Sequence, residues 1–355
     1  MRWYARWTAS TRVTSTEKAG PAVTEHFKNV CIVGAGAIGG WIGAGLARAG
    51  CTVSVLARGQ TLAALQRDGL QLQSGPADAL HTQTHPVHAS SSAQELGPQD
   101  LVVVAVKAPA MRDAALQMAP LLGPHSVVLT AMNGVPWWFL QGFGGALQGR
   151  QLSTVDPGGE IATAITPEHI VGSVVHASCS VSAPGVVRHG FGNKLILGEP
   201  SGVRSARVIA LAALLERAGF EAPLTDRIQR DIWFKLWGNM TMNPVSAITG
   251  ATSTQVLDDE LVRRFCTRVM EEAKEIGARI GITIDQEPDD RHVVTRKLGS
   301  FKTSMLQDVE AGKAVELDAL VGAVRELGAL TQVATPYTDG LLGLARLHAR
   351  VRGLY

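Results

Sequence analysis

The chain has 355 residues, 46% of them hydrophobic, so it can bury two cores of ordinary size. Its 33 basic and 31 acidic residues leave a net charge of +2, which excludes a broad basic surface for nucleic acid or anionic lipid. No apolar run approaches the roughly 20 residues of a membrane helix. The four dispersed cysteines show neither metal-binding nor disulfide spacing. We expect a soluble, cytoplasmic, two-domain protein that binds no nucleic acid, membrane or metal.

Residues 1–28 combine arginine with threonine, serine and glutamate and lack the apolar stretch of a secretory signal. We interpret them as a disordered extension. A transit peptide is the alternative, because Arg2, Arg6 and Arg12 precede the first acidic residue.

Residues 29–58 have the pattern of a buried strand, a glycine turn, a helix and a second strand. The turn contains the GxGxxG pattern Gly34, Ala35, Gly36, Ala37, Ile38 and Gly39. In this context the pattern is typical of dinucleotide binding, because its glycines permit a tight turn, close approach of a pyrophosphate, and close packing of helix on strand. The alternative is a glycine-rich packing turn.

Arg58 follows the second strand, where NAD enzymes usually present an acidic residue to the ribose hydroxyl. No acid lies near it, and an arginine can pair with a 2′-phosphate. The sequence therefore favours NADPH and NADP+ over NADH and NAD+. A surface arginine without this role is the alternative.

Two further buried strands are expected within residues 100–107 and 126–134. The alternation of strands and helices predicts a parallel, doubly wound α/β sheet of Rossmann type. Lys107 and Asn133 stand at the carboxyl ends of these strands, where such sheets bind their ligands. Each residue also has an interpretation without a ligand: Lys107 as a solvated residue at the sheet edge, and Asn133 as part of an Asn-Gly turn.

Residues 159–199 are β-rich and predict antiparallel additions to the sheet. After one more helix, the chain becomes almost entirely helical from residue 226. We therefore divide it into an NADP-binding domain, 29–225, and a helical domain for substrate binding and dimerisation, 226–355. A homodimer is plausible on this pattern.

One segment of the helical part carries three polar residues at i, i+4 and i+8, namely Lys235, Asn239 and Asn243. A helix would align them on one face among large apolar residues. An amine in such surroundings is costly without a partner, which favours a functional role over a solvent-facing stripe.

Around these residues the chain resembles the ketopantoate reductase (2-dehydropantoate 2-reductase) family. The similarity rests on the pattern W-x-K-L-x-x-N-x-x-x-N-P from Trp233 to Pro244, on Ser304-Met-Leu-Gln-Asp308, and on the later Glu316. The glycine pattern, Arg58, Lys107 and Asn133 match as well, so the resemblance extends from about residue 29 to the C-terminus.

The resemblance implies NADPH-dependent reduction of a small 2-oxo acid, 2-dehydropantoate to pantoate, in pantothenate biosynthesis. Lys235 would be the general acid at the ketone oxygen, and Glu316 would hydrogen-bond that oxygen or a substrate hydroxyl. Lys107 would approach the cofactor from the sheet. The residues that would orient substrate and nicotinamide are Asn133, Asn239, Asn243 and Ser304.

Several readings stay open. Trp137 and Trp138 follow Asn133 and could reshape the pocket, so a paralogous reductase of another 2-oxo acid is one alternative, and a non-catalytic NADP(H)-sensing module is another. A simpler interpretation of Asp308 is that it pairs with a residue of its own helix, and a simpler interpretation of Asp318 is that it is a negative charge at the start of a helix. We interpret the histidines as structural residues rather than metal ligands or catalytic bases. They include the group His81, His85 and His88 and the pair His176 and His189.

Overall fold

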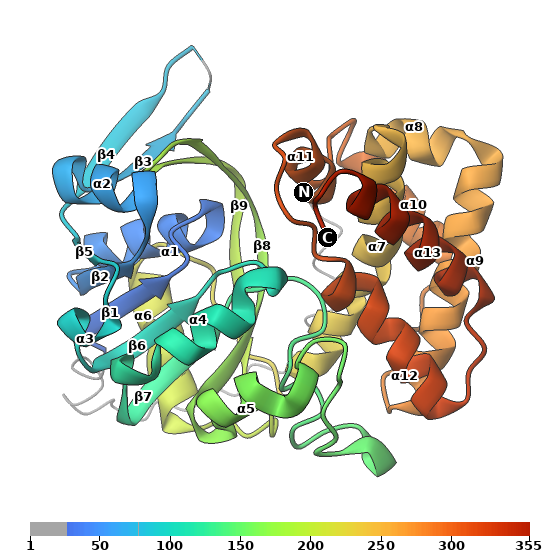
Figure 1. Ribbon diagram of the computed structural model, residues 1–355, viewed down its shortest axis with the longest axis horizontal. Helices are drawn as coiled ribbons and strands as arrows, with labels where there is room; N and C mark the ends of the chain where they lie inside the picture. Colours follow the sequence, from blue (N-terminus) through green and yellow to red (C-terminus); the bar gives the residue numbers. More distant parts are fainter. Residues whose placement is uncertain (1–26, 77) are drawn as a thin grey trace, which may run out of the picture.

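A computed structural model describes residues 27–76 and 78–355, with a strand-rich half beside a helical half (Figure 1). The extension expected over residues 1–28 lies outside the described residues except for its last two. Of these, Phe27 packs against the core and Lys28 donates its backbone N–H to the carboxylate of Asp100 at 2.9 Å. The neighbouring N–H of Asn29 donates to the same carboxylate at 2.8 Å, so Asp100 fixes the start of the first strand.

The strand-rich half is built on one sheet with the order β4-β3-β9-β8-β7-β6-β1-β2-β5. The neighbours from β8 through β7, β6, β1 and β2 to β5 are parallel. Antiparallel pairs join β8 to β9 and β3 to β4, and β3 lies parallel to β9. The strands are β1 (Asn29–Val33), β2 (Thr52–Leu56), β3 (Leu70–Ser74), β4 (His81–His85), β5 (His88–Ser90), β6 (Gln99–Val104), β7 (Leu122–Thr130), β8 (Ile170–Ala183) and β9 (Val186–Gly198). The expected α/β class is confirmed, with the antiparallel additions in β8 and β9.

Side chains alternate along the central strands into two separate cores, as the pleat of a strand requires. In β1, Val30 and Ile32 enter one core, and Cys31 and Val33 enter the other. Helices cover both faces, which explains why these strands are apolar throughout. One face carries α1 (Ala37–Arg48), α2 (Gly59–Asp68) and α6 (Ala206–Arg217), and the other carries α3 (Ala93–Leu96), α4 (Met111–Gln117) and α5 (Glu160–Ala164).

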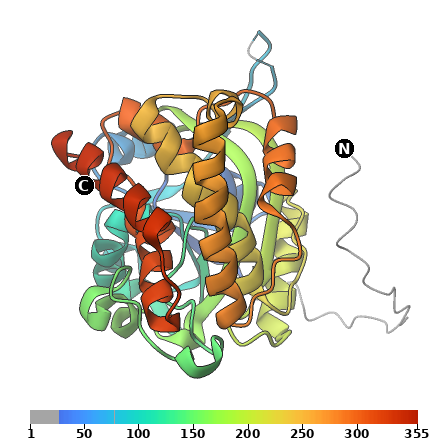
Figure 2. The same cartoon turned by 90° about the vertical axis from the view of Figure 1, so that its right-hand side faces the viewer.

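The helical half is arranged around α7, which packs against α9, α11 and α13 and also contacts strand β8. Figure 2 looks onto this half and shows the long α9 running along it. Two tryptophans tie α7 to α9: the indole N–H of Trp233 donates to the carbonyl of Ala273, and that of Trp237 to the carbonyl of Met270. The elements are α7 (Ile228–Thr249), α8 (Ser253–Asp258), α9 (Glu260–Arg279), α10 (Pro288–Lys297), α11 (Ser304–Glu310), the π-helical turn η7 (Asp318–Gly322), α12 (Ala323–Thr331) and α13 (Pro336–Val351).

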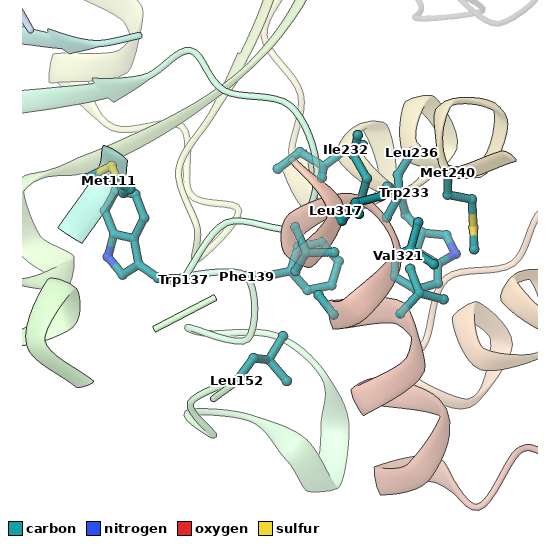
Figure 3. Close-up of a cluster of buried hydrophobic side chains, with 14 of the residues drawn as sticks. Met111, Trp137, Phe139, Leu152, Ile232, Trp233, Leu236, Met240, Leu317 and Val321 are labelled. Carbon is teal, nitrogen blue, oxygen red and sulfur yellow. The ribbon is translucent and has the colours of Figure 1, made fainter. Parts of the chain in front are cut away.

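One hydrophobic core runs from the sheet into the helical half (Figure 3). Met111, Trp137 and Phe139 contribute from the sheet side, and Trp233 and Val321 from the helices. The two halves therefore share buried surface, which opposes independent motion of each. Within residues 27–76 and 78–355, no helix combines the length and apolarity needed to cross a lipid bilayer.

Candidate active site

The glycine turn between β1 and α1 leaves space where a dinucleotide would lie. Gly34 has a φ of +96°, and a Cβ on it would lie 2.8 Å from the backbone nitrogen of Val106. A Cβ on Gly39 would overlap the carbonyl oxygen of Gly34, so close packing of the turn requires glycine there. In contrast, a Cβ on Gly36 would meet no atom within 4 Å. The residues between these glycines are Ala35, Ala37 and Ile38, and they are partly buried or lie along the start of α1.

The N-terminus of α1 also suits an anion. Gly36 is the N-cap residue and offers no side chain to the free N–H groups, and the first turn holds no acid. Free N–H groups and the helix dipole together attract a negative group. The open side of the turn and its electrostatics therefore fit a pyrophosphate.

Arg58 lies just beyond β2 as the N-cap residue of α2, and it is exposed. In the described part of the chain it forms no ion pair, whereas the nearby Arg67 binds Asp68. Its guanidinium is thus available to a phosphate at the ribose end of a dinucleotide.

Lys235 projects from α7 toward the sheet, and its ammonium group makes two hydrogen bonds. Its Nζ donates to Oδ1 of Asn133 at 2.9 Å and to the carbonyl oxygen of Val175 at 2.6 Å. An ammonium group has three N–H donors. Because the described residues accept only two of them, the third remains for a ligand in the cleft beside it. That cleft is lined by Met132, Asn133, Gly134, Ser173, Val174, Ile232, Lys235, Leu236 and Asn239.

The surroundings of Lys235 make it a better proton donor than an ordinary lysine. Burial lowers its pKa from 10.5 to about 8, the negative charge of Glu316 raises it, and the positive charge of Arg291 lowers it. An acid with a pKa near the working pH transfers protons most effectively. The site thus holds a protonated amine that can give up its proton near neutral pH.

Glu316 precedes η7 and is buried, with 8% of its surface exposed. One carboxylate oxygen accepts the backbone N–H of Ala108 at 3.1 Å, in the turn η2 (Ala108–Ala110) that follows β6. Burial raises the pKa of Glu316, whereas the N–H of Ala108 and the charges of Lys107 and Lys235 lower it. The charge of this carboxylate therefore acts on two lysines that come from opposite halves.

Lys107 forms an ion pair with Asp308, which is itself 8% exposed. The interpretation of Asp308 as an intrahelical partner is therefore wrong, because its partner comes from the other half of the molecule. The proximity of two segments so far apart in sequence could not be read from spacing. The simpler interpretation of Asp318 was a negative charge at the start of a helix. Its carboxylate accepts a hydrogen bond from the hydroxyl group of Tyr355 at 2.7 Å.

The cleft gathers some of the residues singled out from the sequence and omits others. Lys235, Asn133 and Asn239 line it together. Asn243 and Ser304 are not among the lining residues: Asn243 is buried one turn further along α7, and Ser304 is exposed at the start of α11. The hydrogen bond from Lys235 to the carbonyl of Val175 could not be predicted from the sequence, because any residue type supplies a main-chain acceptor.

Trp137 and Trp138 do not line the cleft. Both are buried in the shared core, and the edge of Trp138 lies against Gly172 of β8. The expectation that they reshape the pocket is therefore not met by direct contact, and Trp138 instead packs beneath strand β8.

His176 lies near Lys235 on β8. Burial and the charges of Lys235, Arg291 and Lys194 lower its pKa to about 3, so the imidazole is neutral and cannot donate a proton to a ligand at neutral pH. His189 stacks on Trp41 with ring centroids 5.6 Å apart. Among the described residues, no three His, Cys, Asp or Glu side chains gather closely enough to hold a metal ion.

Two family models match the chain. The model described as ketopantoate reductase PanE/ApbA covers residues 30–138, and its C-terminal counterpart covers residues 227–349. A 2-dehydropantoate 2-reductase of Mesorhizobium japonicum is 47% identical over 327 residues, which are 92% of this chain and 99% of that protein.

Solved structures show the same similarity. A crystal structure from Ralstonia solanacearum, provisionally named a ketopantoate reductase, is 56% identical with a TM-score of 0.88 and covers 93% of this chain and 100% of its own. A dimeric ketopantoate reductase of Staphylococcus aureus is 18% identical with a TM-score of 0.71, over 91% of this chain and 99% of its own, and shows likeness of fold alone.

Proposed function

The chain belongs to the ketopantoate reductase family, and from this premise we propose that it reduces 2-dehydropantoate to pantoate, with NADPH as the reductant. The observation that carries the proposal is the ammonium group of Lys235, which uses two N–H donors on Asn133 and Val175 and keeps one for the cleft. A ketone oxygen placed there would accept that third hydrogen bond. As the ketone is reduced, its oxygen gains negative charge, which a fixed cation stabilises.

NADPH, when bound, supplies the hydride for the reaction. The residues that would hold it are the glycine turn around Gly36, with Arg58 at the 2′-phosphate. Arg58 has no competing acid in the described part of the chain, which supports a preference for NADPH over NADH. We place Lys107 on the sheet side of the same crevice, held by Asp308.

Lys235 donates the proton that converts the developing alkoxide to the hydroxyl group of pantoate. Asn133 and the carbonyl of Val175 fix the position of its nitrogen, so the donor does not have to be ordered during the reaction. Glu316 keeps the amine protonated by raising its pKa, and we place this carboxylate near a substrate hydroxyl. Asn239 lines the same cleft and would orient the substrate, with Asn243 and Ser304 further out.

We also propose a division of labour between residues 29–225, which bind the cofactor, and residues 226–355, which bind the substrate and dimerise. Support for a homodimer comes from α13, where Leu344, Leu347 and Val351 lie on one face with 63%, 61% and 76% of their surfaces exposed. The four free thiols, Cys31, Cys51, Cys179 and Cys266, support a cytoplasmic location.

The test is NADPH oxidation by the purified chain with 2-dehydropantoate and a panel of other 2-oxo acids. We expect turnover of 2-dehydropantoate that is lost in Lys235→Met and retained in Lys302→Met, a control in which the lysine is exposed and paired with Glu310. Turnover of another 2-oxo acid alone would keep the chemistry and replace the substrate. Tight NADPH binding without turnover of any 2-oxo acid would contradict the enzymatic proposal and favour a sensing module.

A further inference from the structure

The π-helical turn η7 begins two residues after Glu316 and packs against the strand-rich half. The carbonyl of Ala319 in this turn accepts the backbone N–H of Val135 at 2.8 Å, and a Cβ on Gly134 would lie 2.6 Å from the same oxygen. Glu316 itself accepts the N–H of Ala108 at 3.1 Å. The segment therefore contacts the loops that follow both β6 and β7. Turns of π type are rare and often occur at functional sites.

The same segment is also held by the residues that follow α13. The carbonyl of Leu354 accepts the backbone N–H of Val315 at 3.1 Å. The hydroxyl of Tyr355 donates to Oδ1 of Asp318 at 2.7 Å. In the sequence these two hydrogen bonds fall on either side of Glu316. Leu354 is only 6% exposed and belongs to the shared core, so the residues that make these contacts are themselves anchored.

The hydroxyl of Tyr355 remains a hydrogen-bond donor over the pH range in which Lys235 titrates. Burial, together with the hydrogen bond to Asp318 and its charge, raises the pKa of the tyrosine to about 12, whereas the charges of Arg346 and Arg350 lower it. The guanidinium carbon of Arg350 lies 5.3 Å from the centre of the ring and helps to hold it. A hydrogen bond from a hydroxyl to a carboxylate is also stronger than one between neutral groups.

We propose that Tyr355 is a positioning residue for the reduction: its hydrogen bond to Asp318 holds the segment that carries Glu316 and keeps this carboxylate on the N–H of Ala108. The inference rests on the proposed function. Tyr355 does not line the cleft, so it would act through Glu316 alone. Because the tyrosine is 43% exposed, its hydroxyl adds little to the core. A small displacement of a group in an active site, in contrast, can lower the rate strongly.

The test compares Tyr355→Phe, which removes only the hydroxyl, with Tyr337→Phe, a control at a tyrosine that is also 43% exposed. Tyr355→Phe should lower kcat for 2-dehydropantoate about 3- to 10-fold, the effect of about one hydrogen bond, and leave KM for NADPH unchanged. The alkaline fall of kcat/KM should move to lower pH, because a displaced Glu316 raises the pKa of Lys235 less. A role confined to the fold would not move this profile. Asp318→Asn, which keeps an acceptor, should lose less activity than Asp318→Ala.

A double-mutant cycle shows whether the hydroxyl acts through Glu316. In the Glu316→Gln background, the further change Tyr355→Phe should have little effect on kcat or on the pH profile, because the charge that it positions is already gone. Equal losses in both backgrounds would overturn the inference. Unchanged kcat and an unchanged pH profile in Tyr355→Phe alone would overturn it as well.

Amide hydrogen exchange separates this inference from the proposed function, because it needs no turnover. The N–H of Ala108, which donates to Glu316, should exchange faster in Tyr355→Phe than in wild type or in Tyr337→Phe. Faster exchange in a chain that reduces no 2-oxo acid would sustain the role of Tyr355 in holding Glu316 and reject the reductase. Unchanged exchange would reject the positioning role, whatever the activity.

Discussion

Replacing Lys235 with methionine should change how the stability of the protein depends on pH. In the folded protein the pKa of Lys235 is lowered from 10.5 to about 8, chiefly by burial. Between these pH values the unfolded chain therefore binds more protons at this residue than the folded chain does. The free energy of unfolding consequently rises with pH in this interval, and below pH 8 the folded state carries the full penalty of the buried charge.

The magnitude follows from the two pKa values. The difference between 10.5 and about 8 corresponds to about 3 kcal/mol, and most of it should be recovered by pH 10. Methionine has no proton to lose, so Lys235→Met should lack this contribution. Other groups titrate in the same range, but they do so equally in both proteins, and the difference between wild type and variant isolates Lys235.

The assay is urea unfolding of wild type, Lys235→Met and the exposed control Lys302→Met at pH 7 and pH 10. We expect wild type to gain about 2 to 3 kcal/mol relative to Lys235→Met between the two pH values, and the control to follow wild type. In the same range kcat/KM of wild type should fall as pH rises through about 8, because the deprotonated amine cannot donate. Parallel pH dependence of wild type and Lys235→Met would refute the view that Lys235 is desolvated in the folded protein.

Glu316→Gln removes the negative charge that raises the pKa of Lys235, so the alkaline fall of kcat/KM should move to lower pH; a shift to higher pH would contradict the pairing of these groups. Arg58→Gln should raise KM for NADPH about tenfold or more, because hydrogen bonds to a charged phosphate are lost, and should leave KM for NADH unchanged. Equal effects on both cofactors would exclude a contact with the 2′-phosphate. Gly36→Ala should leave the thermal midpoint nearly unchanged, because its Cβ faces open space, yet it should weaken NADPH binding by occupying that space. Unchanged NADPH titration of this variant would place the pyrophosphate elsewhere.

The central sheet and the glycine turn could be predicted from the sequence because their signals are local. An apolar strand, three glycines and a following helix fall within residues 29–48, and each has its own physical reason. The hairpin strands β3 and β4 have no such signal, since Gln71 alternates with leucines only briefly and residues 81–85 are polar throughout. Their pairing depends on distant partners, which local periodicity does not reveal.

The candidate site shows the same limit. Spacing along α7 suggested that Lys235 and Asn239 share a face, and both line the cleft. The ion pair between Lys107 and Asp308, in contrast, joins two residues that are 201 positions apart in the sequence, and only the folded structure brings them together.

The place of β3 in the sheet has a consequence for the order of events during synthesis. Gln71 of β3 pairs with Val186 of β9, so the N-terminal hairpin of β3 and β4 cannot join the sheet until β9 has been made. Helix α1 likewise contacts β8 and β9, so one side of it stays uncovered until then. A nascent chain that has not yet been synthesised as far as residue 198 would expose the edges of β3 and β7 and a hydrophobic face of α1. Such features recruit chaperones and promote aggregation. Folding of the nucleotide-binding half should therefore be completed late, close to the point at which α7 begins to emerge.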